Sequence, residues 1–540
     1  MKRDSHSLVR KLTVPLLKYI IGAIPKIDVD HVFAFARKVG TFTLTDTPED
    51  TVSRISSGSY IRLAQLQIRG TPFFPSLNRL RIDDAQGSLD HLSLLITDSL
   101  RFLEVVNINQ SQHDVLFSFL CALADECPDL TSVTIFRGET PWLDLCTCFM
   151  HLRELYLDGI SSEFDFDTLV AFGGAFPELE TFILHATNDC YIPLISTSQL
   201  ETGDASEVFS VPLPVGPQGG TQEPADALSP EGQKEAEPAT GLCPSDGRTP
   251  QDGAKSPPPS PTKKIPSIPK PTFRGLKKLD IIGRIGLIHD LLSLCSGLED
   301  VSMTLVHSGE VTNSGIARGI DIFTAVVEEI LSNTSDKRLT RLIIRGQRPV
   351  DPLLKSPPPI LPSHAVKKML LHPTLEYLEI VTWTIDATAT SLSCLAHSPL
   401  HFRSKIKTLR LPGSGMNPGI KLSELCYLAV SFPDLVLLQS AIVLDFKNLP
   451  QYKMGRAADV SLSHNLKTLS IAPFDAPALS YIQHSTVARH LFTLFPALRI
   501  RIETPLRWKP EWNRWRTIGD MLQMYQTVCL DNNARSSHVP

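Results

Sequence analysis

The 540-residue sequence lacks the features of several large protein classes. No apolar stretch reaches the ~20 residues that a membrane span needs, and the best candidate, 12–25, contains Lys18 and lacks the clean apolar core of a secretory signal. No long basic stripe occurs and the formal net charge is −5, which argues against binding driven by phosphate neutralisation. The sequence therefore predicts a cytoplasmic or nuclear protein with no membrane or nucleic-acid partner.

Cysteine patterns typical of metal or disulfide sites are also missing. The chain has ten cysteines but no CxxC pair and no histidine partners at zinc spacing. Such scattered cysteines are typical of reduced, buried thiols in an intracellular protein. Cys146 and Cys148 in LDLCTCF lack a second pair, so we interpret them as core residues and predict no metal and no cofactor.

Motifs of common enzymes are absent as well. HExxH, GxSxG and GxGxxG do not occur. The glycine-rich stretch 409–423 fails the spacing of a phosphate-binding loop, because Ile420 separates Gly419 from Lys421, and we predict a strand-to-helix turn there. The chain is predicted not to be an enzyme, and a catalyst with an unrecognised site is the most distant alternative.

What the chain does contain is a repeated phrase. It reads ECPDLTSVTIF at 126–136, AFPELETFIL at 175–184, SFPDLVLLQS at 431–440 and LFPALRIRIE at 494–503. Each is part of an LxxLxL pattern whose last apolar positions alternate as in a half-buried strand. Apart from one gap, successive copies start 22 to 41 residues apart, at 77, 100, 130, 152, 179, 276, 298, 339, 375, 406, 435, 466 and 497. That period indicates a solenoid.

Segments with the apolar spacing of helices lie between these strands. The clearest are 113–126, 288–295, 321–333, 422–432 and 482–495. Proline has no amide donor and disfavours the helical region at the preceding residue, so the Pro of each phrase should end a helix and start a strand. We predict an α/β leucine-rich-repeat solenoid, with a curved parallel sheet on the concave side, helices on the convex side and a long disordered insertion.

The insertion spans 201–271, which holds 15 of the 42 prolines and one aromatic residue, Phe209. Ser256 and Ser260 precede proline there, and we predict them as phosphorylation sites, although proline-rich segments also contain such pairs by chance. A second proline-rich stretch, 351–362, is interpreted as a loop. The predicted organisation is an N-terminal cap or remnant at 1–30, repeats at 31–200 and 272–504 around the insertion, a capping segment at 505–530 and a disordered tail at 531–540.

The capping segment contains Trp508, Trp512 and Trp515, followed by apolar residues at helical spacing from Ile518 to Cys529. Because the last repeat must bury its open face, we interpret this segment as a capping helix. A ligand cage built from the tryptophans is the alternative.

Residues between the apolar positions of each strand should point away from the core, onto the concave face. They carry charges of both signs and interspersed aromatics, a mixture that suits a folded protein or peptide. The predicted partner-binding residues are Arg79, Arg81, Phe102, Tyr156, Arg341, Tyr377 and Arg410. The alternative is that any soluble solenoid has such a mixed face.

Irregular repeats with FPxL corners resemble the F-box/leucine-rich-repeat family of mushroom-forming (basidiomycete) fungi. FFPSLNRLRIDD at 73–84 and SLRFLEVVNI at 99–108 are similar to its first repeats, and 29–46 to the segment before them. The resemblance implies that the repeats hold a protein substrate, while an F-box docks on the adaptor of a cullin ubiquitin ligase.

The F-box itself is not found. No Leu-Pro-x-Glu-like start occurs, and HSLVRKLTVPLLKYI at 6–20 resembles the tail that follows the box. Either the box was lost or the sequence starts downstream of it, and both cases argue against direct docking on the adaptor. We predict a non-catalytic substrate-recognition solenoid linked to a cullin ligase, with a scaffold or sensor without a ubiquitin link as the alternative.

Overall fold

The structure is a computed structural model, and its described part forms a single unit drawn from Met1–Ile195 and Lys270–Pro540. The described residues are 11–13, 34, 36–45, 72–83, 92–106, 113–136, 146–160, 164–186, 191–192, 272–306, 324, 327–328, 330–331, 338–346, 360–386, 404–412, 416–417, 419–445, 449, 464–471, 479–502 and 510–536.

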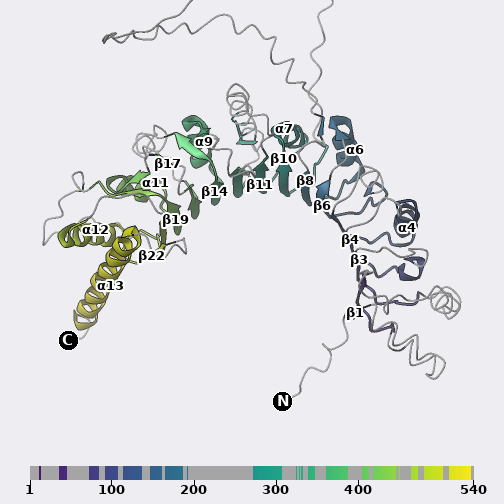
Figure 1. The fold of residues 1–540 in the computed structure, drawn as a ribbon, viewed down its shortest axis with the longest axis horizontal. Helices are drawn as coiled ribbons and strands as arrows, with labels where there is room; N and C mark the ends of the chain where they lie inside the picture. The colour runs from purple at the N-terminus through teal and green to yellow at the C-terminus, as the bar shows by residue number, and fades with distance from the viewer. Residues whose placement is uncertain are drawn as a thin grey trace, which may run out of the picture. The chain divides into compact units, whose positions relative to one another are not determined.

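One sheet of 15 parallel strands runs through this unit, and its strand order follows the chain (Figure 1). The strands are β1 (Lys11–Thr13), β2 (Thr41–Thr45), β3 (Arg79–Asp83), β4 (Phe102–Val106), β5 (Ser132–Phe136), β6 (Glu154–Ile160), β8 (Thr181–Ala186), β10 (Lys278–Gly283), β11 (Asp300–Leu305), β12 (Arg341–Gly346), β14 (Tyr377–Val381), β16 (Thr408–Arg410), β19 (Leu437–Ser440), β21 (Thr468–Ile471) and β22 (Arg499–Ile502). The predicted leucine-rich-repeat solenoid is confirmed.

Helices lie on the other side of the ribbon from these strands, apart from α13, which lies at the C-terminal end of the array beside β22 (Figure 1). They are η3 (Leu92–Leu95), α4 (His113–Glu126), α6 (Phe166–Ala175), α7 (Ile285–Ser293), α9 (Ser363–Leu370), η7 (Leu422–Glu424), α11 (Leu425–Ser431), α12 (Tyr481–Leu494) and α13 (Pro510–Ser536). Three small parallel sheets add β7 (Phe164–Asp165) with β9 (Tyr191–Ile192), β13 (Ile360–Leu361) with β15 (Thr384–Asp386) and β17 (Met416–Asn417), and β18 (Ile420–Lys421) with β20 (Ile442–Val443).

These small strands modify two predictions. The turn predicted at 409–423 contains β17 and β18, and Gly419 lies so close to the next repeat that a Cβ there would be 2.6 Å from Ala441 O. The proline-rich loop predicted at 351–362 ends in β13. Of the helix predicted at 321–333, only five residues are described, and each of them is helical.

The repeats on both sides of the predicted insertion belong to one sheet. β8 pairs directly with β10 from Thr181↔Lys278 onward, and Lys277 Nζ lies 3.1 Å from Glu180 Oε2. The rings of Phe182 and Phe273 stack with their centroids 5.8 Å apart. The insertion therefore interrupts the sequence of the solenoid without interrupting its sheet.

The repeated phrase forms the corner between helix and strand. α4, α6, α11 and α12 each end two residues before the proline. A turn follows, in which the Leu130 amide donates to Cys127 O over 3.0 Å and the Leu498 amide donates to Phe495 O over 3.0 Å. Proline occupies the second position of this turn, which its fixed φ favours. The prediction that the phrase stops a helix and starts a strand is confirmed.

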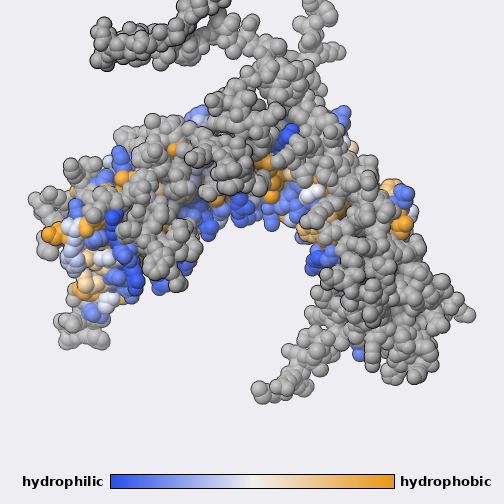
Figure 2. Space-filling view, in the orientation of Figure 1, coloured by the Kyte–Doolittle hydropathy of each residue, from blue (hydrophilic) through white to orange (hydrophobic). Residues whose placement is uncertain are grey.

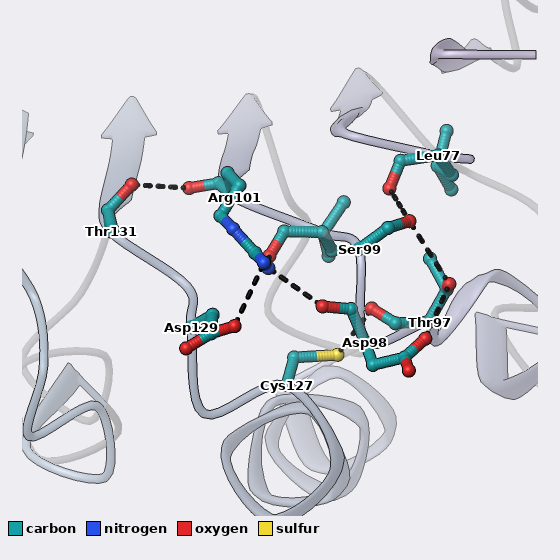
Figure 3. Close-up of polar contacts among 9 residues, drawn as sticks. Leu77, Thr97, Asp98, Ser99, Arg101, Cys127, Asp129 and Thr131 are labelled. Atoms are coloured by element: carbon teal, nitrogen blue, oxygen red, sulfur yellow. Dashed lines mark hydrogen bonds and ion pairs between the residues drawn. The ribbon is translucent and has the colours of Figure 1, made fainter. Parts of the chain in front are cut away.

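Side chains at these corners tie each repeat to the one before it (Figure 3). The Cys127 thiol donates to Thr97 O at 3.0 Å, and the Ser99 hydroxyl donates to Leu77 O at 2.8 Å. Arg101 Nη2 donates to Asp129 Oδ2 at 2.9 Å. Because these partners come from consecutive repeats, the stacking of repeats satisfies polar groups as well as burying apolar ones.

The apolar positions of the repeat form the core. Leu80, Leu155, Leu378 and Leu409, each from a different strand, are at most 1% exposed. The row continues through every strand from β2 to β21 with side chains in register, since a one-residue slip would turn a whole strand inside out.

Two strands before the first predicted repeat went unrecognised in the sequence. Val39-Gly40-Thr41-Phe42-Thr43-Leu44 follows the LxxLxL spacing with Val and Phe in place of leucine, and it forms β2. The segment 6–20, interpreted as the tail that follows an F-box, contributes β1, which pairs with β2 through Leu12↔Phe42. This part of the predicted N-terminal cap therefore belongs to the sheet.

The C-terminal helix α13 covers the end of the array. Trp515, Ile518 and Leu522 are buried, and Gln526 Nε2 donates to Pro496 O and Leu498 O, both at 2.9 Å. Tyr525 stacks on Phe492 and shares a hydrogen bond of 2.8 Å with Ser485. The helix continues past residue 530, the predicted end of the cap, to Ser536, and Cys529 in its last part is exposed.

Several predictions fall outside the described residues. They concern the insertion at 201–271 with Ser256 and Ser260, most of the stretch 351–362, and Trp508 of the tryptophan cluster. Among the described residues, no helix combines the length and apolar character that crossing a bilayer requires.

Candidate functional site

The side of the sheet that faces away from the core carries three rows of side chains, and we call it the strand face. Its central row is held in register by the strand pairing and consists of Thr43, Arg81, Glu104, Thr134, Tyr156, Ile183, Asp280, Ser302, Ile343, Glu379, Arg410, Gln439, Ser470 and Arg501. Every central-row residue from Arg81 onward had been predicted from the LxxLxL spacing. Figure 2 shows hydrophilic residues along the side where β11 and β14 lie in Figure 1.

All seven predicted partner-binding residues lie on this face. Arg79, Phe102, Arg341 and Tyr377 are in the first row, and Arg81, Tyr156 and Arg410 are in the central row. The structure gathers them into three separate patches. That these residues contact a partner stays a prediction.

The arginine patch consists of Arg341, Arg345 and Arg410 with Asp300, Tyr377 and Glu379. Its centre is Glu379, whose side chain is only 10% exposed and lies 3.4 Å from Arg345 Nη2 and 3.7 Å from Arg410 Nη1. Tyr377 donates its hydroxyl to Glu379. Burial and this hydrogen bond raise the pKa of Tyr377, so the phenol stays protonated and holds the carboxylate in place.

Two neighbours in the same patch, Asp300 and Tyr377, fix the side chain of Arg341 in the first row. Arg341 Nη1 donates to both carboxylate oxygens of Asp300, at 3.0 and 3.2 Å. Its guanidinium also lies over the Tyr377 ring, 5.0 Å from the centroid, a cation–π geometry. The guanidinium is thus fixed before any partner arrives, which lowers the entropy lost on binding.

The acidic patch lies on β6, β8 and β10 and consists of Glu154, Tyr156, Asp158, His185 and Asp280, with Phe136 beside it. Asp158 Oδ1 is 3.3 Å from His185 Nδ1, and Asp158 Oδ2 accepts a hydrogen bond of 3.4 Å from Tyr156. The Tyr156 ring lies 5.3 Å from Phe136 and 5.4 Å from His185. Burial and the charge of Asp158 raise the pKa of Tyr156.

A β-bulge follows Asp158, where the register between β6 and β8 shifts. Gly159 has φ of 69°, a left-handed conformation that glycine adopts without a Cβ penalty. Such bulges change the twist of a strand and the direction of nearby side chains.

The third patch lies on β3 and β4, near the N-terminal end of the sheet. Arg81 Nη1 is 2.6 Å from Glu104 Oε1, and Arg81 Nη2 is 2.7 Å from Asp83 Oδ2. Arg79 Nη2 reaches Glu104 Oε2 at 3.4 Å. Phe102 is 39% exposed beside these pairs. This patch has two cations and two carboxylates and therefore no net charge.

The sequence reasoning missed the third row of the strand face. Arg345, Asp158 and His185 belong to this row, each one residue after the last apolar position of its strand. The signal was available, because the same alternation that places the central row also turns this residue away from the core. Extending the pattern to LxxLxLx would have found all three.

The prediction that Cys146 and Cys148 are core residues holds for Cys146 and not for Cys148. Cys146 is fully buried, and burial raises the pKa of its thiol to about 12, as expected of a core residue. Cys148 is exposed, and its side chain interacts with Cys121 of α4. Within the described ranges, no group of three or more His, Cys, Asp or Glu side chains is placed to hold a metal ion.

No protein-family model and no curated protein matches the chain. Solved structures that match the chain include an internalin from Listeria monocytogenes, with 13% identity and a TM-score of 0.33, covering 89% of this chain and 95% of that one. A leucine-rich-repeat protein of Leptospira interrogans shows 11% identity and a TM-score of 0.36, covering 91% of this chain and 99% of its own. The fold assignment itself rests on the strand register described above.

Proposed function

We propose that the chain is a non-catalytic recognition solenoid that binds a protein or peptide on its strand face. The observation that carries this proposal is the arrangement around Glu379, where a nearly buried carboxylate and a tyrosine hold arginines that are 40 to 44% exposed. Side chains fixed in this way are typical of protein interfaces, because arginine and tyrosine supply much of the binding energy and lose little entropy.

The distribution of charge supports a protein partner over a polyanion. Carboxylates of Asp158, Asp280 and Glu379 share the face with the arginines, so a continuous phosphate backbone would meet repulsion at several strands. Aromatic side chains between them offer apolar contact area to a folded partner.

A more specific part of the proposal is that the recognition role is linked to ubiquitination. On the resemblance to F-box/leucine-rich-repeat proteins, the partner would be a substrate that is delivered to a cullin ligase. The alternative is a scaffold or sensor without that link. One observation favours the alternative: the segment that resembles the tail after an F-box contributes β1, and so belongs to the repeat array.

The recognition role is tested by affinity capture with the full chain and two matched variants. Tyr156→Ala/Tyr377→Ala removes two rings of the strand face, while Tyr427→Ala/Tyr481→Ala removes two exposed rings from α11 and α12. Proteins that the second variant retains and the first loses would support the proposal. Identical capture by the native chain and both variants would refute it.

The ubiquitin link has its own test. The purified full chain is mixed with a recombinant cullin adaptor and analysed by size-exclusion chromatography. Co-elution at micromolar concentration is expected for an F-box-type protein, and separate elution would favour the scaffold or sensor.

We also propose that Ser256 and Ser260 are phosphorylated, on the basis of the Ser-Pro pairs in the sequence. Phosphate adds about −1.5 to −2 charges at neutral pH, enough to change which partners bind. A phosphopeptide map of the native protein in which both serines are unmodified would contradict this.

A further inference from the structure

Two patches of the strand face carry opposite charge. The acidic patch has three carboxylates, Glu154, Asp158 and Asp280, against one ammonium group at its margin, Lys278. The arginine patch has three guanidinium groups against the two carboxylates of Asp300 and Glu379. Counting carboxylate, ammonium and guanidinium groups, the acidic patch has a net charge of −3 + 1 = −2 and the arginine patch of +3 − 2 = +1.

The difference in charge between the two patches is larger at the surface that a partner would contact, because the charged groups are not equally exposed. Arg341, Arg345 and Arg410 are 40%, 44% and 40% exposed, whereas Asp300 and Glu379 are 24% and 10% exposed. A partner therefore meets guanidinium groups on the arginine patch, and the carboxylates lie beneath them. On the acidic patch the Asp158 side chain is 37% exposed and Glu154 is exposed.

Between the charged side chains of the two patches, four positions of the central and third rows carry no charge and form an uncharged strip. They are Ile282 at the end of β10, Ser302 and Thr304 on β11, and Ile343 on β12, where the third-row residue is Arg345 of the arginine patch. From Asp158 on β6 to Arg345 on β12, which lie in the same row, the sheet order gives four strand spacings, which is about 19 Å at ~4.8 Å each. An extended segment at ~3.3 Å per residue would cover this distance with about six residues.

Three buried polar atoms without a hydrogen-bond partner among the described residues lie in the two patches and in the strip between them. They are His185 Nε2 in the acidic patch, Ser302 Oγ in the uncharged strip and Arg410 Nε in the arginine patch. A buried polar atom without a partner costs free energy, so side-chain rotations that bring these groups to a bound segment would be favoured.

We propose that the strand face recognises a protein segment that crosses the strands with a basic side chain on the acidic patch and an acidic side chain on the arginine patch. About six residues separate the two charges, and small or apolar side chains cover the strip between them. This inference rests on the proposed recognition function and adds the charge order and spacing of the partner. Tyr156 and Phe136 supply aromatic faces beside the basic side chain, and the guanidinium groups offer paired donors to the carboxylate.

The test uses a display library of random 12-residue peptides selected on the full chain. Enriched peptides should carry a basic and an acidic residue five to seven positions apart, in either order, because the segment can cross the strands in both directions. One such peptide is then synthesised with a fluorescent label, and its Kd is measured by anisotropy on variants of the chain.

Two variants neutralise one patch each. Asp158→Asn/Asp280→Asn should weaken the peptide about fivefold, and a peptide whose basic residue is replaced by methionine should not respond to this variant. Arg345→Gln/Glu379→Gln/Arg410→Gln should also weaken the peptide about fivefold, and a peptide whose acidic residue is replaced should not respond to this variant. The variant removes the buried carboxylate of Glu379 together with the two arginines that it contacts. Asp125→Asn and Lys367→Gln, both exposed on the helix side, serve as controls and should leave Kd unchanged.

The outcomes separate this inference from the proposed function. Peptides that lose binding with Tyr156→Ala/Tyr377→Ala but lack the spaced charge pair would overturn the inference and leave strand-face recognition standing. Coupling of the basic residue to the arginine patch, or failure to select any peptide, would also overturn it. Peptides whose binding responds to no strand-face variant would contradict both proposals.

Discussion

The central row of leucines should contribute strongly to stability, and Leu378→Ala tests this. Leu378 is fully buried and pairs in register with Leu342 and Leu409, which are also fully buried. The substitution removes about three carbon atoms at ~0.8 kcal/mol each and leaves a cavity that rigid neighbouring strands cannot fill, so we expect a loss of about 3–4 kcal/mol.

The matched control is Val381→Ala in the same strand. Val381 ends β14 on the strand face and is 36% exposed, so its truncation should cost less than about 0.5 kcal/mol. Because a repeat array need not unfold in one step, the local free energy of opening should be measured by native-state hydrogen exchange with mass spectrometry.

The location of the effect is as informative as its size. Exchange should accelerate most in β12, β14 and β16, which share hydrogen bonds, and least in β3 to β5 at the other end of the sheet. A loss below about 1 kcal/mol, or an equal loss for the control, would refute the assignment of this row as the core. Equal acceleration along the whole sheet would instead show that the array opens as one unit.

Three further predictions concern pH, thiol reactivity and the insertion. Burial lowers the pKa of His372, His464 and His490, and His464 accepts a hydrogen bond from the Leu466 amide at Nδ1, so the folded state keeps these rings neutral. Stability should therefore be complete above about pH 6.5 and decrease as the pH falls below it, by at most about 1.4 kcal/mol per pH unit for each histidine; urea midpoints that stay constant from pH 7 to 5 would contradict this. Iodoacetamide should modify the exposed Cys148 long before the buried Cys146, and peptide mapping that finds equal rates would show that Cys146 is accessible. Replacing 196–269 with a glycine–serine linker of about 15 residues should leave the thermal midpoint within a few degrees, because β8 and β10 pair directly; loss of folding would show that the insertion contributes to the core.

The sequence contained enough information to predict the repeat register. Alternation in LxxLxL assigns every second side chain to the core, and the FPxL corner marks where each strand begins, so the central row from Arg81 to Arg501 followed from local spacing. The repeat that contains Val39 and Phe42 was not recognised, because these residues replace leucines of the pattern, although the spacing is kept.

Contacts between side chains of different repeats could not be predicted in the same way. Glu379 meets Arg345 and Arg410, which lie 34 residues before it and 31 residues after it in the chain, and only strand pairing brings them together. The grouping of Tyr156, Asp158 and His185 likewise follows from the pairing of β6 with β8, which sets Asp158 beside His185.

The amino-acid sequence by itself determined which side chains face the core and which face away, because a period of two and a proline corner act within single repeats. Only the tertiary structure decided which exposed side chains become neighbours and how deeply each is buried. Those properties depend on the pairing of strands across loops of unequal length, and from them follow the buried Glu379 and the opposite charges of the two patches.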